Sequence, residues 1–90
     1  MTNQILLIGR LKEISNTELV VEVRENVNSN DTVILTVVVG ENIMKHVKDL
    51  CHIDDLVGIK AFFKNELGRV VIYADKITFL SSKNNNEGGE

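Results

Sequence analysis

Apolar and polar positions alternate with a period of two over much of this 90-residue chain. Residues 5–12 start as an apolar run that becomes alternating, and residues 32–39 form a nearly continuous β-branched run. Between them, Leu19, Val21 and Val23 alternate with Glu18, Glu22 and Arg24. These patterns predict three strands, the second with one solvent-facing side and the third buried on both faces for part of its length. Polar clusters at residues 15–17 and 26–31 predict the turns between them, the second a flexible hairpin loop.

The period then changes to that of a helix. Ile43, Val47, Leu50 and Cys51 recur at a spacing of three or four residues, with polar side chains between them. This spacing predicts one helix of about ten residues, which we expect to plug a barrel formed by the strands. Cys51 is interpreted as a small hydrophobic residue at the end of that helix.

Alternation returns in the last third of the chain. Residues 56–64 and 69–80 predict two strands joined by a tight connection at residues 65–68, so the pair forms a hairpin. Phe63 and Phe79 take the core-facing parity of their strands, and we assign both to the core.

Three strands, a helix and two more strands is the element order of the oligonucleotide-binding (OB) fold. We therefore predict an all-β domain over residues 1–80, a five-stranded OB-fold barrel with one short α-helix between the third and fourth strands. Gly9 lies where a bent or bulged first strand would let another backbone come close. Residues 81–90 contain no apolar side chain and are expected to form a disordered tail.

Charge is distributed unevenly along the chain, whose net charge is −3. Residues 1–55 carry five Lys/Arg against nine Asp/Glu, whereas residues 56–83 carry five Lys/Arg against two Asp/Glu. A site for an anion such as nucleic acid therefore needs a local basic face, which we expect in the last third.

No segment approaches the roughly 18 apolar residues that span a bilayer, and residues 1–4 lack the features of a signal peptide. The single cysteine, Cys51, has no partner for a disulfide or a CxxC site. These features predict a cytoplasmic protein that does not bind membranes.

Catalytic and metal-binding patterns are weak. His46 and His52 are too far apart in sequence to lie on one helical face as metal ligands, and Asp54 and Asp55 are typical of a turn before the fourth strand. Because there is also no phosphate-binding glycine loop or nucleophile elbow, we predict no enzymatic activity, no cofactor or metal and no small-molecule substrate.

Phe62 alternates with Lys60 and Lys64, so an aromatic ring lies between two cations, as a base-stacking surface requires. The alternative is that Phe62 packs under a loop or in a subunit contact. Tyr73, with Arg69 and Lys76 nearby, is either a second stacking platform or an edge residue with its hydroxyl in solvent.

Two further cations, Arg10 and Lys12, share a face at the end of the first strand. They could pair with phosphates of a strand crossing the barrel, although a solvated strand end has the same pattern. Arg24 has Glu22 and Glu25 beside it, so we assign it to a local ion pair.

Three stretches of sequence resemble the bacterial single-stranded DNA-binding proteins. Residues 3–11 (NQILLIGRL) resemble the family's opening strand, residues 55–62 (DLVGIKAF) its fourth strand, and residues 74–83 (ADKITFLSSK) its closing strand. With VVVG at residues 37–40 leading into the helix, the resemblance covers residues 3–83. It implies a dimeric or tetrameric barrel that holds single-stranded DNA in replication, recombination or DNA transfer, without a cofactor.

The chain departs from the family pattern in three respects. Val33 and Val39 stand near places where the family has stacking aromatics, and the connection at residues 65–68 is very short. The end of the chain, residues 86–90, has no apolar acidic tip of the kind that recruits partner enzymes in the family. We therefore expect weakened DNA binding and no recruitment through such a tip.

Taken with the residues themselves, the resemblance leads to a prediction of sequence-independent single-stranded DNA binding by a homo-oligomer. The expected contact residues are Arg10, Lys12, Lys60, Phe62, Lys64, Arg69, Tyr73 and Lys76. The alternative is an OB-fold protein-interaction or assembly module that has lost most DNA binding.

Overall fold

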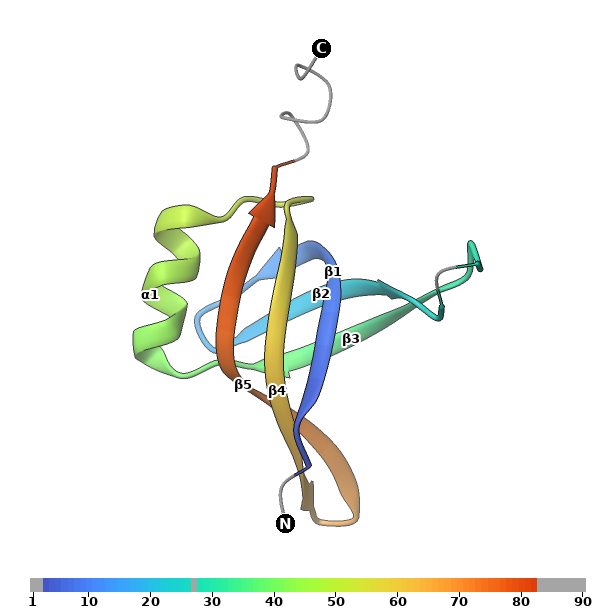
Figure 1. The fold of residues 1–90 in the computed structure, drawn as a ribbon. Coiled ribbons are helices and arrows are strands. Elements are labelled where there is room, and N and C mark those ends of the chain that lie inside the picture. The colour runs from blue at the N-terminus through green and yellow to red at the C-terminus, as the bar shows by residue number, and fades with distance from the viewer. Residues whose placement is uncertain (1–2, 27, 83–90) are drawn as a thin grey trace.

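Five strands and one helix make up residues 3–26 and 28–82, the part of the chain that a computed structural model describes (Figure 1). In order they are β1 (Ile5–Ile14), β2 (Glu18–Arg24), β3 (Thr32–Val38), α1 (Glu41–Leu50), β4 (Leu56–Glu66) and β5 (Arg69–Ser81). The predicted element order is confirmed. Of the predicted tail, Ser81 ends β5, Ser82 follows it, and residues 83–90 lie outside the described residues.

The strands form a closed barrel in the order β1-β2-β3-β5-β4, which confirms the predicted five-stranded OB fold. β1 is shared between two neighbours: Ile5–Arg10 pair with β4, and Gly9–Ile14 pair with β2. All pairings are antiparallel except that of β3 with β5, which closes the barrel through only two register pairs, Val37 with Ile72 and Val38 with Tyr73.

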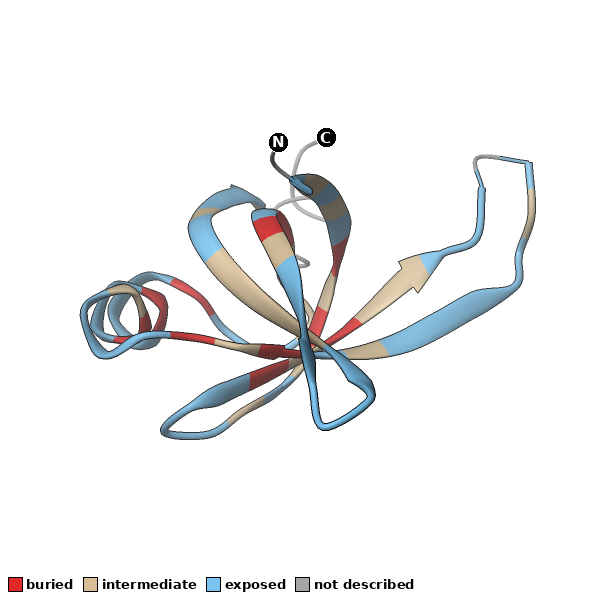
Figure 2. Cartoon of the chain, turned by 90° about the horizontal axis from the view of Figure 1, so that it is seen from below, coloured by how far each residue is buried: buried red, intermediate tan, exposed pale blue. Residues whose placement is uncertain are grey.

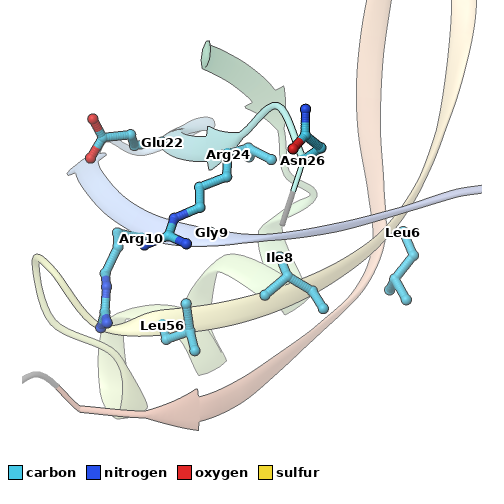
Figure 3. A pocket seen from close by; sticks show the side chains of 9 residues that line it. Leu6, Ile8, Gly9, Arg10, Glu22, Arg24, Asn26 and Leu56 are labelled. Atoms are coloured by element: carbon cyan, nitrogen blue, oxygen red, sulfur yellow. The ribbon is translucent and has the colours of Figure 1, made fainter. Parts of the chain in front are cut away.

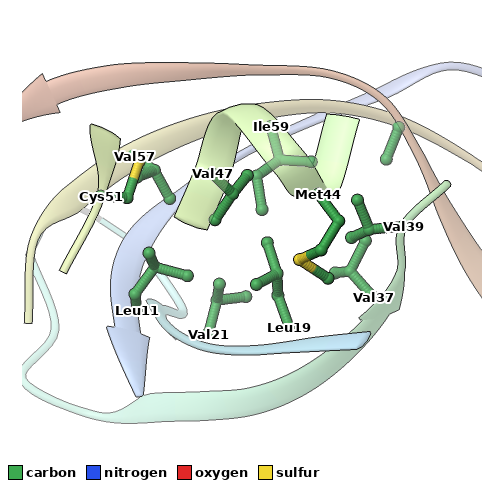
Figure 4. Packing of buried hydrophobic residues seen from close by; sticks show 11 residues of the cluster. Leu11, Leu19, Val21, Val37, Val39, Met44, Val47, Cys51, Val57 and Ile59 are labelled. Carbon is green, nitrogen blue, oxygen red and sulfur yellow. The ribbon is translucent and has the colours of Figure 1, made fainter. Parts of the chain in front are cut away.

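The hydrophobic core consists of inward-facing residues from every second position of the strands, closed at one side by α1 (Figure 4). Met44 and Val47 of the helix are buried, so the prediction that the helix plugs the barrel is confirmed. Cys51, which caps α1, is also buried, and this burial raises the pKa of its thiol. Leu50, in contrast, points away from the core and is exposed.

Gly9 lies where β1 passes against β2, as predicted from the sequence. A Cβ atom at this position would collide with the backbone carbonyl oxygen of Glu22. The register irregularity of β1 falls slightly later, between Leu11 and Glu13. Gly9 therefore permits the close approach, and the bulge that follows bends the strand from β4 toward β2.

Two hairpins project beyond the barrel, β2–β3 at one side and β4–β5 at its lower end in Figure 1. The predicted tight connection of β4 to β5 is confirmed as a two-residue turn, in which Leu67 and Gly68 both have positive φ. Asn65 stabilises the turn because its side-chain oxygen accepts a hydrogen bond of 2.9 Å from the Gly68 N–H. Such turns match the twist of the flanking strands, so the hairpin extends without splaying.

Two aromatic residues assigned to the core are exposed: Phe63 is 37% and Phe79 is 41% accessible. Both have the predicted inward parity, but they lie near the ends of the barrel. Beside Phe63, the pairing of β1 with β4 has already ended at Ile5 and Ala61, and only the side chain of Asn3 continues it by bonding both backbone groups of Phe63. Parity therefore identified the face of each ring, whereas the end of β1 determined the exposure of Phe63.

β3 was predicted to be buried on both faces for part of its length, and its first half does not belong to that part. Thr32, Val33 and Ile34 are exposed, and burial begins only towards the end of the strand, at Val37 (Figure 2). The reason is that β3 reaches β5 only at its last residues, so the preceding residues lie on a projecting hairpin.

Candidate nucleic-acid interface

Phe62 and Tyr73 form the centre of the candidate site on the outer face of the β4–β5 hairpin. They are direct register partners, which places their side chains on the same face. Their rings are stacked, with centroids 5.6 Å apart and an angle of 15° between the planes. The two predicted aromatic platforms are therefore a single aromatic surface.

Lys64 lies two residues beyond Phe62 and so shares its face. Its Nζ atom is 5.8 Å from the centroid of the Phe62 ring and 5.2 Å from that of Tyr73. At this distance an ammonium group is attracted to the aromatic rings. The structure thus brings together three of the predicted site residues as a cation next to stacked rings.

Glu66 belongs to the same face and was not predicted. The Tyr73 hydroxyl donates a hydrogen bond to the Glu66 carboxylate, and this bond is the main reason that the pKa of Tyr73 is raised. Arg69 lies opposite Glu66 at the tip of the hairpin, yet no ion pair joins the two within the described chain. Strand parity with Phe62 and Lys64 would have identified Glu66. We call Phe62, Lys64, Glu66, Arg69 and Tyr73 the hairpin surface.

Lys60 and Lys76 lie directly opposite each other nearer the barrel, on the same outer face. They line a shallow groove of about 320 Å³ together with Leu6, Ile8, Gly58, Thr78 and Leu80. Both lysines are exposed, and neither forms an ion pair with any residue between 3 and 82 that the structure describes. Their ammonium groups are therefore available to an anion.

Arg10 and Lys12 lie apart from the hairpin surface and hold the loop that precedes β4. The Lys12 Nζ atom lies 2.7 Å from Oδ1 of Asp54 and 3.6 Å from Oε1 of Glu22. The hydrogen bond to Asp54 is the largest cause of the raised pKa of Lys12. Arg10 donates to the Asp54 backbone carbonyl oxygen over 3.2 Å. Lys12 is thus neutralised by carboxylates, a use that the sequence analysis did not consider.

The local ion pair assigned to Arg24 is wrong, because Arg24 forms no ion pair with the described residues. Glu22 instead pairs with Lys12 and accepts a hydrogen bond from Thr32. Arg24 lines an open groove of about 550 Å³ with Arg10 and apolar residues of β1 and β4 (Figure 3). Sequence neighbours could not reveal this arrangement, because the partner that captures Glu22 comes from another strand.

Val39, one of the two residues near the expected family aromatics, is buried in the core, whereas Val33 is exposed. Only Val33 is therefore accessible to a ligand.

Asp54 and Asp55 form the predicted turn, with the buried Asp55 carboxylate accepting a 2.7 Å hydrogen bond from the His52 N–H. Within residues 3–26 and 28–82 there is no cluster of His, Cys, Asp and Glu suited to a metal, and no helix that could span a membrane.

Solved structures of single-stranded DNA-binding proteins superpose on this barrel over nearly their full lengths. They include mitochondrial Rim1 from S. cerevisiae, with 14% identity, 91% of this chain and 98% of that chain covered and a TM-score of 0.78. The chain has their fold. The same fold is found in the SSB domain of a Synechococcus sp. protein, with 16% identity, 87% of this chain and 96% of that chain covered and a TM-score of 0.69. It is also found in a small single-stranded DNA-binding protein from Streptomyces coelicolor, with 15% identity, 89% of this chain and 94% of that chain covered and a TM-score of 0.60.

The resemblance seen in sequence is therefore confirmed at the level of the fold. No protein-family profile matches the chain, and no curated protein sequence matches it. At identities near 15% the fold is shared while side chains at the surface are free to differ. The function must therefore be argued from the residues of this chain.

Proposed function

We propose that this protein binds single-stranded DNA without sequence preference through the hairpin surface and the adjacent Lys60 and Lys76. The observation that carries the proposal is the stacked pair of Phe62 and Tyr73 with Lys64 beside both rings. Every base has a π-face, so an accessible aromatic surface binds bases irrespective of sequence, and neighbouring cations bind the phosphates. Double-stranded DNA offers no unstacked bases to such a surface.

The distribution of charge supports the same proposal. Lys60, Lys64, Arg69 and Lys76 all lie on the outer face of β4 and β5, so cations line a path from the hairpin tip to the barrel. Arg10 could extend this path at the far end of β1, whereas Lys12 would have to leave Asp54 and Glu22 to contribute. The solved structures named above, which share this fold, are single-stranded DNA-binding proteins, and this agrees with the proposal.

We further propose that the protein acts as a homo-oligomer assembled through β1. Ile5–Ile8 pair with β4 on one side, and their other edge pairs with no strand among the described residues. Leu6 and Ile8 are 71% and 51% exposed, and Leu80 beside them is also exposed. An open strand edge and an apolar surface together favour pairing with a second copy. The role would be replication, recombination or DNA transfer, without a cofactor.

Fluorescence anisotropy with labelled oligo(dT) of about 30 nucleotides, long enough for two or more OB folds, tests the DNA-binding proposal. Contacts with three to five phosphates predict that log K falls with log salt with a slope of about −2 to −3.5. Binding that resists a duplex competitor and follows this slope supports the proposal. Binding without salt dependence, or no binding by a folded sample, contradicts it.

A second candidate function is an OB-fold assembly module without DNA binding. It is favoured by the acidic Glu66 on the hairpin surface and by the neutralisation of Lys12. The double substitution Lys60→Glu and Lys64→Glu separates the two: it abolishes DNA retention if DNA binds here and leaves the oligomer unchanged in either case. Dissociation of the oligomer by Phe62→Ala would instead favour the assembly module.

A further inference from the structure

A second open edge lies on β3, on the opposite side of that strand from β2. All seven residues of β3 pair with β2, but only Val37 and Val38 pair with β5. Within the described chain, the outer edge of Thr32–Thr36 therefore has no strand beside it. Leu35 in this segment is half-buried and the other four residues are exposed, and Figure 2 shows the exposed first residues of β3 in pale blue on the hairpin that projects from the barrel.

This edge has none of the usual protection against pairing. The five residues are Thr32, Val33, Ile34, Leu35 and Thr36, with no charge, proline or glycine among them. Val33 is 40% and Ile34 is 57% exposed. Natural strand edges that stay unpaired are normally blunted by lysine, proline or a bulge, so an uncharged edge of mostly β-branched residues indicates a pairing partner.

We propose that this edge pairs with the same edge of a second copy, antiparallel and centred on Ile34. The order Thr, apolar, Ile, apolar, Thr reads alike in both directions. A two-fold axis at Ile34 then places Ile34 opposite itself, Val33 opposite Leu35 and Thr32 opposite Thr36. Each of these pairs is favourable across strands, and no like charges meet.

The neighbouring charges do not oppose this arrangement. Glu22 and Arg24 lie on β2, opposite Ile34 and Thr32 and one strand further from the two-fold axis. Glu22 is already paired with Lys12. The β3 edge is also separate from the open edge of β1, so the proposal depends neither on DNA binding nor on the β1 contact.

Because Ile34 lies opposite the same residue of the second copy, the proposal can be tested by sedimentation velocity of the full chain over a range of concentrations. Ile34→Lys and Ile34→Glu each place two like charges opposite one another, so each variant alone should lose the largest assembly formed by the wild type. An equimolar mixture of the two should regain it, because Lys then faces Glu. Val70→Lys, which charges a comparably exposed apolar residue on the other hairpin, serves as the matched control and should sediment like the wild type.

Oxidation of an Ile34→Cys variant provides an independent readout. Residues directly opposite each other in antiparallel strands have Cα atoms about 4.5–5.5 Å apart, within the range of a disulfide. We expect a covalent dimer from Ile34→Cys and none from Val70→Cys, while the buried Cys51 stays reduced in both. Identical sedimentation of the wild type and both charged variants, with no cross-link at position 34, would overturn the proposal. Thermal melting of each variant establishes that it is folded.

Discussion

Lys60 and Lys76 face each other across β4 and β5 with no carboxylate of the described chain paired to either. Like charges directly opposite in a sheet destabilise it by up to about 1 kcal/mol. The pair therefore costs stability in the free protein, and an anion bound between the two lysines would relieve that cost. An unfavourable pair of opposing lysines is therefore expected in a protein that binds a phosphate backbone.

Replacing Lys76 with Glu should have opposite effects on stability and on binding. A carboxylate placed opposite Lys60 exchanges repulsion for attraction, so the urea midpoint should rise, by the equivalent of about 1 kcal/mol at most. Affinity for oligo(dT) should fall, and the salt slope should become shallower by about 0.7. Lys45→Glu on the exposed surface of α1 makes the same change in net charge and should alter neither the urea midpoint nor the binding of oligo(dT). A decrease in stability for Lys76→Glu would contradict the account of the lysine pair.

Removal of an aromatic ring from the hairpin surface should weaken DNA binding without unfolding the barrel. Stacking of a base on an aromatic side chain contributes about 1–3 kcal/mol, so Phe62→Ala should raise the Kd for oligo(dT) by roughly 5- to 150-fold. Leu67→Ala removes an apolar side chain from the fully exposed tip of the same hairpin and should bind normally. Equal affinities of the two variants in the anisotropy assay would exclude the stacked pair as the base platform.

Titration of Tyr73 can be followed directly, because it is the only tyrosine of the chain. Its pKa is raised above 10.0, chiefly by the hydrogen bond to Glu66, so the folded state favours the neutral phenol. This contribution to stability is present below the pKa of the unfolded chain and is lost as the pH rises through the higher folded value. Ultraviolet titration of Glu66→Ala should show a lower Tyr73 pKa than the wild type. An unchanged pKa would mean that the bond does not form in solution.

Gly9 should tolerate no side chain. Gly9→Ala directs a Cβ atom at the Glu22 carbonyl, and the strands must separate to admit it, which we expect to cost on the order of 1–3 kcal/mol of unfolding free energy. At Gly40 a Cβ atom meets no neighbour within 4 Å, and Ser is a favoured helix N-cap, so Gly40→Ser should be neutral or slightly stabilising. Urea denaturation of both variants checks the contrast.

Local periodicity was sufficient to predict the fold because each strand pattern reports which face meets the core. Gly9 and the turn at residues 65–68 were also predictable, since glycine fits the close approach at Gly9 and the positive φ at Gly68, although the positive φ of Leu67 has no signal in its residue type. The exposure of Phe63 was not, because it depends on where β1 ends beside β4. A single strand pattern contains no information about the length of its neighbour.

The candidate site was predictable where it lies on one hairpin and not where it joins distant segments. Phe62, Lys64 and Tyr73 come together through the register of β4 with β5, which a tight turn fixes. Lys12 meets Asp54 across 42 positions of sequence and also pairs with Glu22, whereas Arg24 forms no ion pair among the described residues. Contacts of this kind become visible only once the fold is known.

The unequal joining of the strands gives the barrel a preferred line of opening. β4 and β5 share eleven register pairs, whereas β3 and β5 share two. Local opening costs least where few pairs must break, so backbone amides that donate across the contact of β3 with β5 should exchange sooner than those in the middle of β4. Once this seam parts, the five strands remain joined in the order β3-β2-β1-β4-β5. The cylinder can thus unroll into one continuous curved sheet, with both projecting hairpins at its free ends, without losing any other strand pair.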